Sequence, residues 1–179
     1  MSDLKKKIID EIIKAEGGFV DDPNDSGGAT NLGITEAVAR ENGYTGAMID
    51  LPYKFAFNIY ASKYWDSVCA DELLSVSEDL AAEVVDTAVN MGPGRAGKFL
   101  QRCLNSLNDR AGLYMDIVVD GDIGPRTVAA VRYYALARDV SVMVKALNCL
   151  QGAFYIQLAE RREKDESFVY GWLRMRVKL

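Results

Sequence analysis

Apolar residues at the start of the chain recur with the period of an α-helix. They stand at positions 4, 8, 9, 12 and 13, a pattern that predicts an amphipathic helix from residue 2 or 3 to Ala15. Glu16 takes the next position on the same apolar face, and Gly17-Gly18 then ends the helix. A carboxylate on an apolar face loses hydration, which favours its protonated form and suits it to proton donation. The plainer interpretation is that Glu16 only ends a helix and the glycines only cap it.

The segment that follows, residues 17–35, is crowded with Gly, Asp, Asn, Ser and Thr. Asp25 and Thr30 bracket Gly27-Gly28, which gives a polar loop beside the candidate acid. Short apolar stretches at 19–20 and 32–34 flank the turn residues, so the segment predicts a small β-hairpin or an irregular loop.

The rest of the chain is predicted to be mainly α-helical. Thr35 caps a short helix that ends at residues 42–43, and Pro52 opens the next helix. Ser75 and Glu78 have the spacing of a capping box, which predicts a helix that ends near residue 90. Further helices are expected at residues 95–107, 125–138 and 140–164.

The helix after Pro52 carries an aromatic stripe with helical spacing. Such a stripe usually packs in a core, whereas a sugar-binding cleft uses aromatic faces together with phenol hydroxyls. The stripe consists of Tyr53, Phe57, Tyr60 and Tyr64, with Trp65 adjacent.

Composition narrows the possible chemistry. The 179 residues include no histidine, which excludes Ser-His-Asp and Cys-His catalysis and the commonest zinc ligand. A net charge of −5 argues against non-specific binding to nucleic acid. The cysteines, 69, 103 and 149, are scattered and odd in number, as expected for reduced, buried thiols. Neither a metal nor an organic cofactor is expected.

Three motifs near the N-terminus resemble the signature of the muramidases of glycoside hydrolase family 108. They read E-G-G at residues 16–18, D-S-G-G-A-T at 25–30 and G-I-T at 33–35. The order Glu, Asp, Thr also resembles that of phage lysozymes, with one residue fewer between Asp25 and Thr30. Ser26 departs from the proline expected there, which removes no catalytic role.

The resemblance continues along the chain and adds candidate site residues. The block at residues 60–65 resembles the family's Y-x-x-x-Y-W motif, and the block at 86–96 resembles D-T-A-V-N-x-G-P-G-x-A. It implies catalytic roles for Glu16, Asp25 and Thr30. The substrate-binding candidates are Asn31, Tyr60, Tyr64, Trp65 and Asn90, while Tyr53 and Phe57 are expected to pack. For Asn90, a helix C-cap is the structural alternative.

Residues 120–127, D-G-D-I-G-P-R-T, resemble the motif of peptidoglycan-binding modules. On physical grounds alone the motif is an Asp-Gly turn followed by a helix that begins at Pro125. The resemblance divides the chain into a muramidase catalytic lobe at 1–92 and a helical C-terminal lobe at 93–179, packed as one unit. The closing Gly171-Trp172-Leu173 block is expected to hold the C-terminus against the domain.

The resemblance implies a lysozyme-like, two-lobed helical fold that cleaves the β-1,4 bond between N-acetylmuramic acid and N-acetylglucosamine. Glu16 would be the general acid, and Asp25 and Thr30 would hold or activate water. Three alternatives remain: a non-catalytic peptidoglycan-binding module, a lytic transglycosylase, and a muramidase that assists protein secretion.

The implied biology is that of a phage endolysin. The N-terminus has no apolar run long enough for a signal peptide or membrane span, so the chain is expected to be made in the host cytoplasm. It would act on the periplasmic wall after release by a holin, as a monomer that binds glycan strands, without stable membrane insertion.

Overall fold

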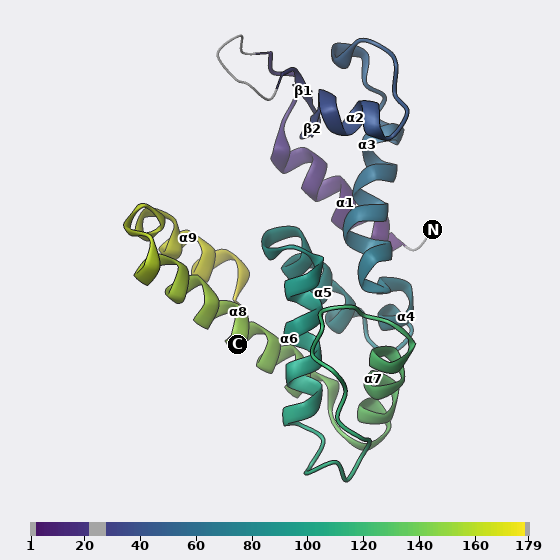
Figure 1. The fold of residues 1–179 in the computed structure, drawn as a ribbon, viewed down its shortest axis with the longest axis vertical. Helices are drawn as coiled ribbons and strands as arrows, with labels where there is room; N and C mark the ends of the chain where they lie inside the picture. The colour runs from purple at the N-terminus through teal and green to yellow at the C-terminus, as the bar shows by residue number, and fades with distance from the viewer. Residues whose placement is uncertain (1–2, 22–27, 178–179) are drawn as a thin grey trace. The chain divides into compact units, whose positions relative to one another are not determined.

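The computed structural model describes residues 3–21 and 28–177 (Figure 1). This part of the chain is mainly α-helical with one small antiparallel hairpin after the first helix, as predicted. Its contacts group into two compact units, Met1–Asp66 and Ser67–Leu179. The predicted division at residue 92 stays a prediction.

The first unit is organised around two packed helices, α1 (Asp3–Glu16) and α3 (Tyr53–Tyr60). The apolar face of α1 is buried through Ile9, Ile12 and Ile13, as its periodicity predicts. A π-helical turn, Ala61–Trp65, continues α3 and brings Trp65 into the core with no exposed surface. A short 3-10 helix, Met48–Asp50, precedes α3.

The hairpin of the first unit consists of β1 (Thr30–Asn31) and β2 (Ile34–Thr35). Thr30 pairs with Thr35 and Asn31 with Ile34. The two turn residues, Leu32 and Gly33, have φ of 52° and 73°, the backbone twist of the tightest hairpin turns. Thr30 also exchanges two backbone hydrogen bonds of 2.8 Å with Val20. Helix α2 (Glu36–Glu41) follows, and Thr35 Oγ1 accepts from the Val38 N–H as its predicted cap.

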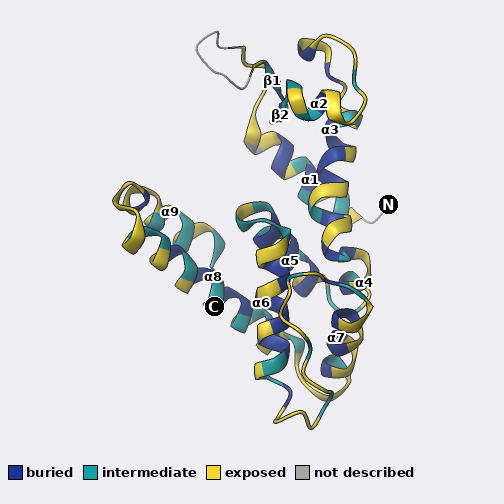
Figure 2. Ribbon diagram, in the orientation of Figure 1, coloured by how far each residue is buried: buried dark blue, intermediate teal, exposed yellow. Residues whose placement is uncertain are grey.

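The second unit is a bundle built around α5 (Glu78–Met91). This helix packs against α4 (Ala70–Leu74), α6 (Pro93–Ser106) and α8 (Val140–Arg161), and α7 (Pro125–Ala137) packs against α4 and α6. Figure 2 shows the buried residues gathered on the faces where these helices meet. The largest side chains buried there include Leu73, Leu80, Leu100, Leu104, Tyr134, Met143 and Leu147.

Two boundaries of the second unit differ from the predicted ones. Ser77, and not Ser75, caps α5, because its Oγ accepts from the Leu80 N–H while Ser75 Oγ donates to the Glu72 carbonyl. The predicted helix at 140–164 ends at Arg161, and a separate α9 (Glu166–Arg176) folds back onto α8. Trp172 of α9 lies 5.1 Å from Tyr155 of α8 between ring centroids, as expected for a closing block that holds the C-terminus.

The peptidoglycan-module motif at residues 120–127 has a structural role in this unit. The buried amide of Gln101 donates to Asp120 Oδ1 at 2.8 Å and to the Asp122 carbonyl at 2.9 Å, and its Oε1 accepts from the Gly121 N–H at 2.8 Å. Gly97 lies against Gly121 so closely that a Cβ would come within 2.1 Å of the Gly121 carbonyl oxygen. The Asp-Gly turn is therefore clamped onto α6, and Pro125 begins α7 as predicted.

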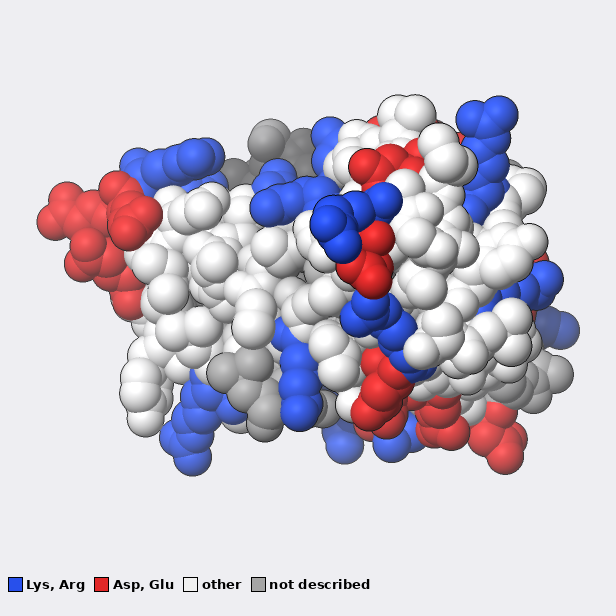
Figure 3. All heavy atoms as spheres, turned by 90° about the horizontal axis from the view of Figure 1, so that it is seen from below, with Lys and Arg blue, Asp and Glu red and all other residues white. Residues whose placement is uncertain are grey.

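The surface carries mixed charge. Figure 3 shows lysine and arginine side chains interspersed with acidic ones on the face that it displays. Within residues 3–21 and 28–177, no helix has both the length and the apolar character needed to cross a membrane. The three cysteines are free thiols; Cys103 is buried, whereas Cys149 is exposed, which differs from the expectation of buried thiols.

Candidate active site

Glu16 is the last residue of α1, and the chain turns sharply after it. Gly17 has φ of +89°, a conformation that glycine adopts without strain. The side chain of Glu16 is exposed. Its place on the apolar face predicts burial, but Glu16 is exposed because α1 ends at this residue.

The hairpin turn meets Glu16 at Gly33. A Cβ added to Gly33 would come within 2.3 Å of Tyr60 Oη, 2.6 Å of Glu16 Cβ and 2.8 Å of Glu16 Cγ. Gly33 thus lies so close to Glu16 and Tyr60 that no side chain fits at this position. The G-I-T motif at residues 33–35 therefore lies against the E-G-G motif in the fold. Only glycine fits at position 33, between Glu16 and Tyr60.

Tyr60 holds the hairpin turn beside Glu16 in place. It is 5% exposed, and its hydroxyl donates to the Leu32 carbonyl at 3.1 Å. Burial raises the pKa of Tyr60 above its ordinary value, and the nearby Glu16 carboxylate and Tyr64 raise it further. The phenol therefore stays protonated at all physiological pH values and can serve as a fixed donor at the hairpin turn.

The other N-terminal candidates have different surroundings. Asn31 is buried, and its Nδ2 donates to the carbonyls of Met48 at 2.8 Å and Ile49 at 3.1 Å, so its amide holds the 3-10 helix in place. Thr30 is partly exposed in β1 and lies on the strand that leads to the Glu16 contact. Asp25 lies outside the described residues.

The aromatic candidates divide by exposure. Tyr64 is partly exposed and stacks on Tyr60 with ring centroids 5.9 Å apart. Trp65 is 0% exposed, so its indole packs within the protein beneath the ammonium group of Lys5, 5.7 Å from the ring centroid. Trp65 is therefore a core residue that packs behind the site, and it has no exposed surface that a substrate could contact.

Asn90 lies in the second unit, near the end of α5. Its Nδ2 donates to the backbone carbonyl of Asp86 at 2.7 Å and to Asp86 Oδ2 at 3.2 Å. The side chain is exposed and held against its own helix. Its predicted contact with sugar stays a prediction.

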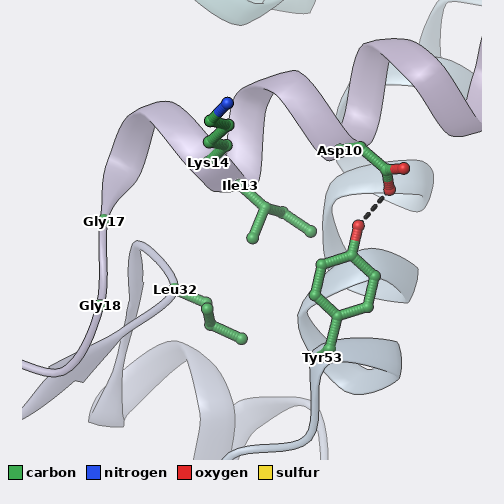
Figure 4. A pocket seen from close by; sticks show the side chains of 7 residues that line it. All are labelled: Asp10, Ile13, Lys14, Gly17, Gly18, Leu32 and Tyr53. Atoms are coloured by element: carbon green, nitrogen blue, oxygen red, sulfur yellow. Dashed lines mark hydrogen bonds between the residues drawn. The ribbon is translucent and has the colours of Figure 1, made fainter.

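A hollow of about 530 Å³ adjoins Glu16 (Figure 4). One of its lining residues is Tyr53, which the sequence predicts to be packed; its side chain is instead 46% exposed and donates a hydrogen bond to Asp10. The sequence feature that could have indicated the exposure of Tyr53 is its place in the first turn of a helix, where one side of the residue lacks helical neighbours. The residues that line the hollow are Asp10, Ile13, Lys14, Gly17, Gly18, Leu32 and Tyr53.

The described residues contain no group of three or more Asp, Glu, Cys or His side chains with the geometry to hold a metal ion. At Glu16 the described residues supply a carboxyl group, a protonated phenol and the backbone of a tight turn. Such a set can transfer a proton to an oxygen atom and bind hydroxyl groups.

Family models match both halves of the chain. Residues 9–92 match Glycosyl hydrolase 108, and residues 95–177 match the family described as Predicted Peptidoglycan domain. The predicted combination, a family 108 hydrolase followed by a half of peptidoglycan-binding type, is confirmed by these matches. Together the matches point to a glycoside hydrolase that acts on peptidoglycan.

A solved structure from Brucella abortus, that of SagA, is similar over nearly the whole chain. The two sequences are 28% identical, the match covers 95% of each chain, and the TM-score is 0.54. No curated protein sequence shows a significant match. The likeness to SagA therefore spans both halves and not the hydrolase part alone.

Proposed function

We propose that the protein is an N-acetylmuramidase with Glu16 as its general acid. The substrate bond is the β-1,4 linkage between N-acetylmuramic acid and N-acetylglucosamine in peptidoglycan. The observation that carries the proposal is the close packing of Gly33 against Glu16 Cβ and Cγ and against Tyr60 Oη, at an exposed helix end within the family 108 half.

In this mechanism the Glu16 carboxyl group donates its proton to the glycosidic oxygen as the bond from that oxygen to the anomeric carbon breaks. A water molecule adds to the anomeric carbon and loses its proton to a base. Asp25 and Thr30 are the groups proposed to hold or activate this water. Because Glu16 is exposed in the free protein, the bound glycan strand supplies the desolvation that favours its protonated form.

The test is digestion of purified peptidoglycan sacculi followed by mass spectrometry of the soluble products. A muramidase yields hydrated fragments with reducing N-acetylmuramic acid ends. Anhydro ends would indicate a lytic transglycosylase, reducing N-acetylglucosamine ends a glucosaminidase, and no products a binding module.

The Glu16→Gln variant assigns the acid in the same experiment. General acid–base groups contribute about 10²–10⁴-fold to rates, so turnover should fall by at least about a hundredfold. The variant should keep its thermal midpoint and its binding to sacculi. A loss below tenfold in a folded variant would show that another group is the acid.

The proposed biological role is that of a prophage endolysin, made in the host cytoplasm and released to the periplasmic wall by a holin. Its support is the combination of a glycosidase half and a peptidoglycan-directed half in one short chain. Expression of the protein alone in a Gram-negative host should be tolerated, and co-expression of a holin should cause lysis. Lysis on expression alone would contradict this route.

A further inference from the structure

The hollow beside Glu16 has one wall made by an exposed aromatic ring. In Figure 4 the ring of Tyr53 faces the space between Ile13, Leu32 and the backbone of Gly17-Gly18. Among the described residues, no atom lies within 4 Å of a Cβ built on Gly17 or Gly18, so this part of the chain leaves their backbone open to a ligand. The volume of about 530 Å³ lies within the ordinary range of ligand pockets.

Tyr53 is held in place from α1. Its hydroxyl donates to Asp10 Oδ1, while the other oxygen of Asp10 pairs with Lys6. The hydrogen bonds from Lys6 and Tyr53 lower the pKa of Asp10, and burial with the Asp10 bond raises the pKa of Tyr53 to about 12. Donor and acceptor therefore keep the required protonation states at neutral pH, and the ring is oriented before any ligand arrives.

Two lining residues of the hollow are chain neighbours of Glu16, the proposed acid, or of Gly33, which lies against it. Gly17 directly follows Glu16, and Leu32 directly precedes Gly33, which contacts the Glu16 side chain. A ligand that lies on Tyr53 is consequently a neighbour of the bond that Glu16 cleaves. Lys14 borders the hollow, but its side chain points away from the space in Figure 4.

We infer that Tyr53 is a sugar-binding platform on which a hexose ring of the glycan strand stacks next to the cleaved linkage. Asp10 is its positioning residue. This inference rests on the proposed function and adds the subsite to it. A half-exposed tyrosine offers an apolar face for the C–H groups of a sugar, and the fixed ring loses little conformational entropy on binding.

The experiment measures kcat and KM on soluble peptidoglycan glycan strands for the wild type, Tyr53→Ala, Tyr53→Phe and Asp10→Asn. Removal of the ring in Tyr53→Ala should raise KM by roughly five- to tenfold, the effect of an aromatic contact of about 1 kcal/mol or slightly more, with kcat changed less. Tyr53→Phe keeps the ring and should raise KM only about twofold. Asp10→Asn weakens the same hydrogen bond, so the double variant Tyr53→Phe/Asp10→Asn should be no worse than the more affected single one.

Tyr133→Ala is the matched control, because Tyr133 is 58% exposed on α7 in the second unit. Its KM should equal that of the wild type. Thermal midpoints of all variants identify any that fail to fold, and the Tyr53→Phe and Asp10→Asn variants then carry the test. An unchanged KM in folded Tyr53→Ala, or an equal loss of kcat with KM unchanged, would overturn the platform.

Binding in the Glu16→Gln background separates this inference from the proposed function. The affinity of the inactive protein for the same soluble glycan strands, measured by isothermal titration calorimetry, should weaken on adding Tyr53→Ala by the same factor as KM rises. If Glu16→Gln abolishes turnover while Tyr53→Ala binds as tightly as its parent, the function stands and the platform is wrong. If Glu16→Gln stays active, the proposed acid is wrong whatever Tyr53 does.

Discussion

At the scale of single residues, Gly33 links backbone conformation to the proposed acid. Two conditions act on it together: a φ of +73°, and contact with Tyr60 and Glu16 on the side where a Cβ would point. The positive φ and the close contact each favour glycine, but only the close contact involves Glu16. A substitution can separate them, because the chain contains a glycine that meets the first condition alone.

We expect Gly33→Ala to lower both activity and stability. The added methyl group collides with Glu16 and Tyr60, so turnover should fall at least tenfold and the free energy of unfolding by about 2–4 kcal/mol, from backbone strain and overpacking together. Gly43→Ala is the control: Gly43 has φ of +87°, and no atom of the described part of the chain lies within 4 Å of its Cβ position. It should cost only the strain, about 1 kcal/mol, and leave turnover intact. Similar effects of both substitutions would mean that the contact is unimportant.

Asp25→Asn tests the second carboxylate of the motif. If Asp25 activates water, kcat should fall at least about a hundredfold with little change in KM. If it only caps a turn, stability should fall by about 1 kcal/mol with turnover retained. Thr30→Ala is measured alongside, and wild-type kinetics in both variants would restrict the proton chemistry to Glu16.

At the scale of elements, the turn at residues 120–124 depends on one side chain of α6. Gln101 is buried and serves Asp120, Gly121 and Asp122 at once, while Gly97 and Gly121 let the two backbones touch. The motif that resembles a peptidoglycan-binding signature is thus the part that joins α6 to α7. Its residues are needed for the fold of the second unit.

Gln101→Leu should therefore destabilise the second unit by about 2–4 kcal/mol, because it leaves buried partners without hydrogen bonds. Gln157→Leu, a change of the same kind at an exposed position of α8, should have an effect within about 0.5 kcal/mol. Denaturant unfolding monitored by circular dichroism measures both. Equal stability of the two variants would contradict the structural role of the clamp.

The same clamp predicts a dependence on pH. Hydrogen bonds from the Gln101 amide and then from the Asp122 N–H lower the pKa of Asp120 below its ordinary value of 3.8. A carboxylate with a lowered pKa stabilises the folded state above its unfolded value, and that contribution is lost as the pH falls through the folded value. Stability should decline below about pH 4. In Asp120→Asn this part of the decline should disappear, so an identical pH profile in the variant would contradict the assignment.

At the scale of the whole molecule, the boundary between families and the boundary between compact units do not coincide. The family models meet between residues 92 and 95, whereas the contacts divide the chain after Asp66. Helix α5 belongs by sequence to the hydrolase half, yet its buried residues pack against α4, α6 and α8 of the second unit. The residue block from 86 to 92 therefore depends on the second half for its structure.

Fragments that differ in this boundary should differ in folding. Residues 67–179 keep α5 and should melt cooperatively on their own. Residues 93–179 lack α5 and expose the apolar faces of α6 and α8 that it covers, so they should form no cooperative structure. Thermal unfolding followed by circular dichroism compares the two, and a cooperative transition of the shorter fragment would show that the family boundary is also a folding boundary.

The sequence by itself determined the helical architecture and indicated Glu16 as the proposed acid. Local signals suffice for both: the period of apolar residues in α1, the caps at Thr35 and Pro125, and the Glu16-Gly17-Gly18 motif all act within a few neighbouring residues. The same local signals misplaced one cap, since Ser75 and Ser77 both precede α5 and only their contacts distinguish them.

Only the tertiary structure decided which aromatic residues are exposed and what surrounds the acid. The spacing of the aromatic residues from Tyr53 to Tyr64, with Trp65 adjacent, predicts one helical face. A π-helical turn at Ala61–Trp65 changes the helical phase at one end of this stripe. At the other end, Tyr53 lies in the first turn of α3, beside Asp10 of α1. Trp65 is buried and Tyr53 exposed as a result. The contact of Glu16 with Gly33 likewise joins residues 17 positions apart, because hairpin and helix end meet only in the folded chain.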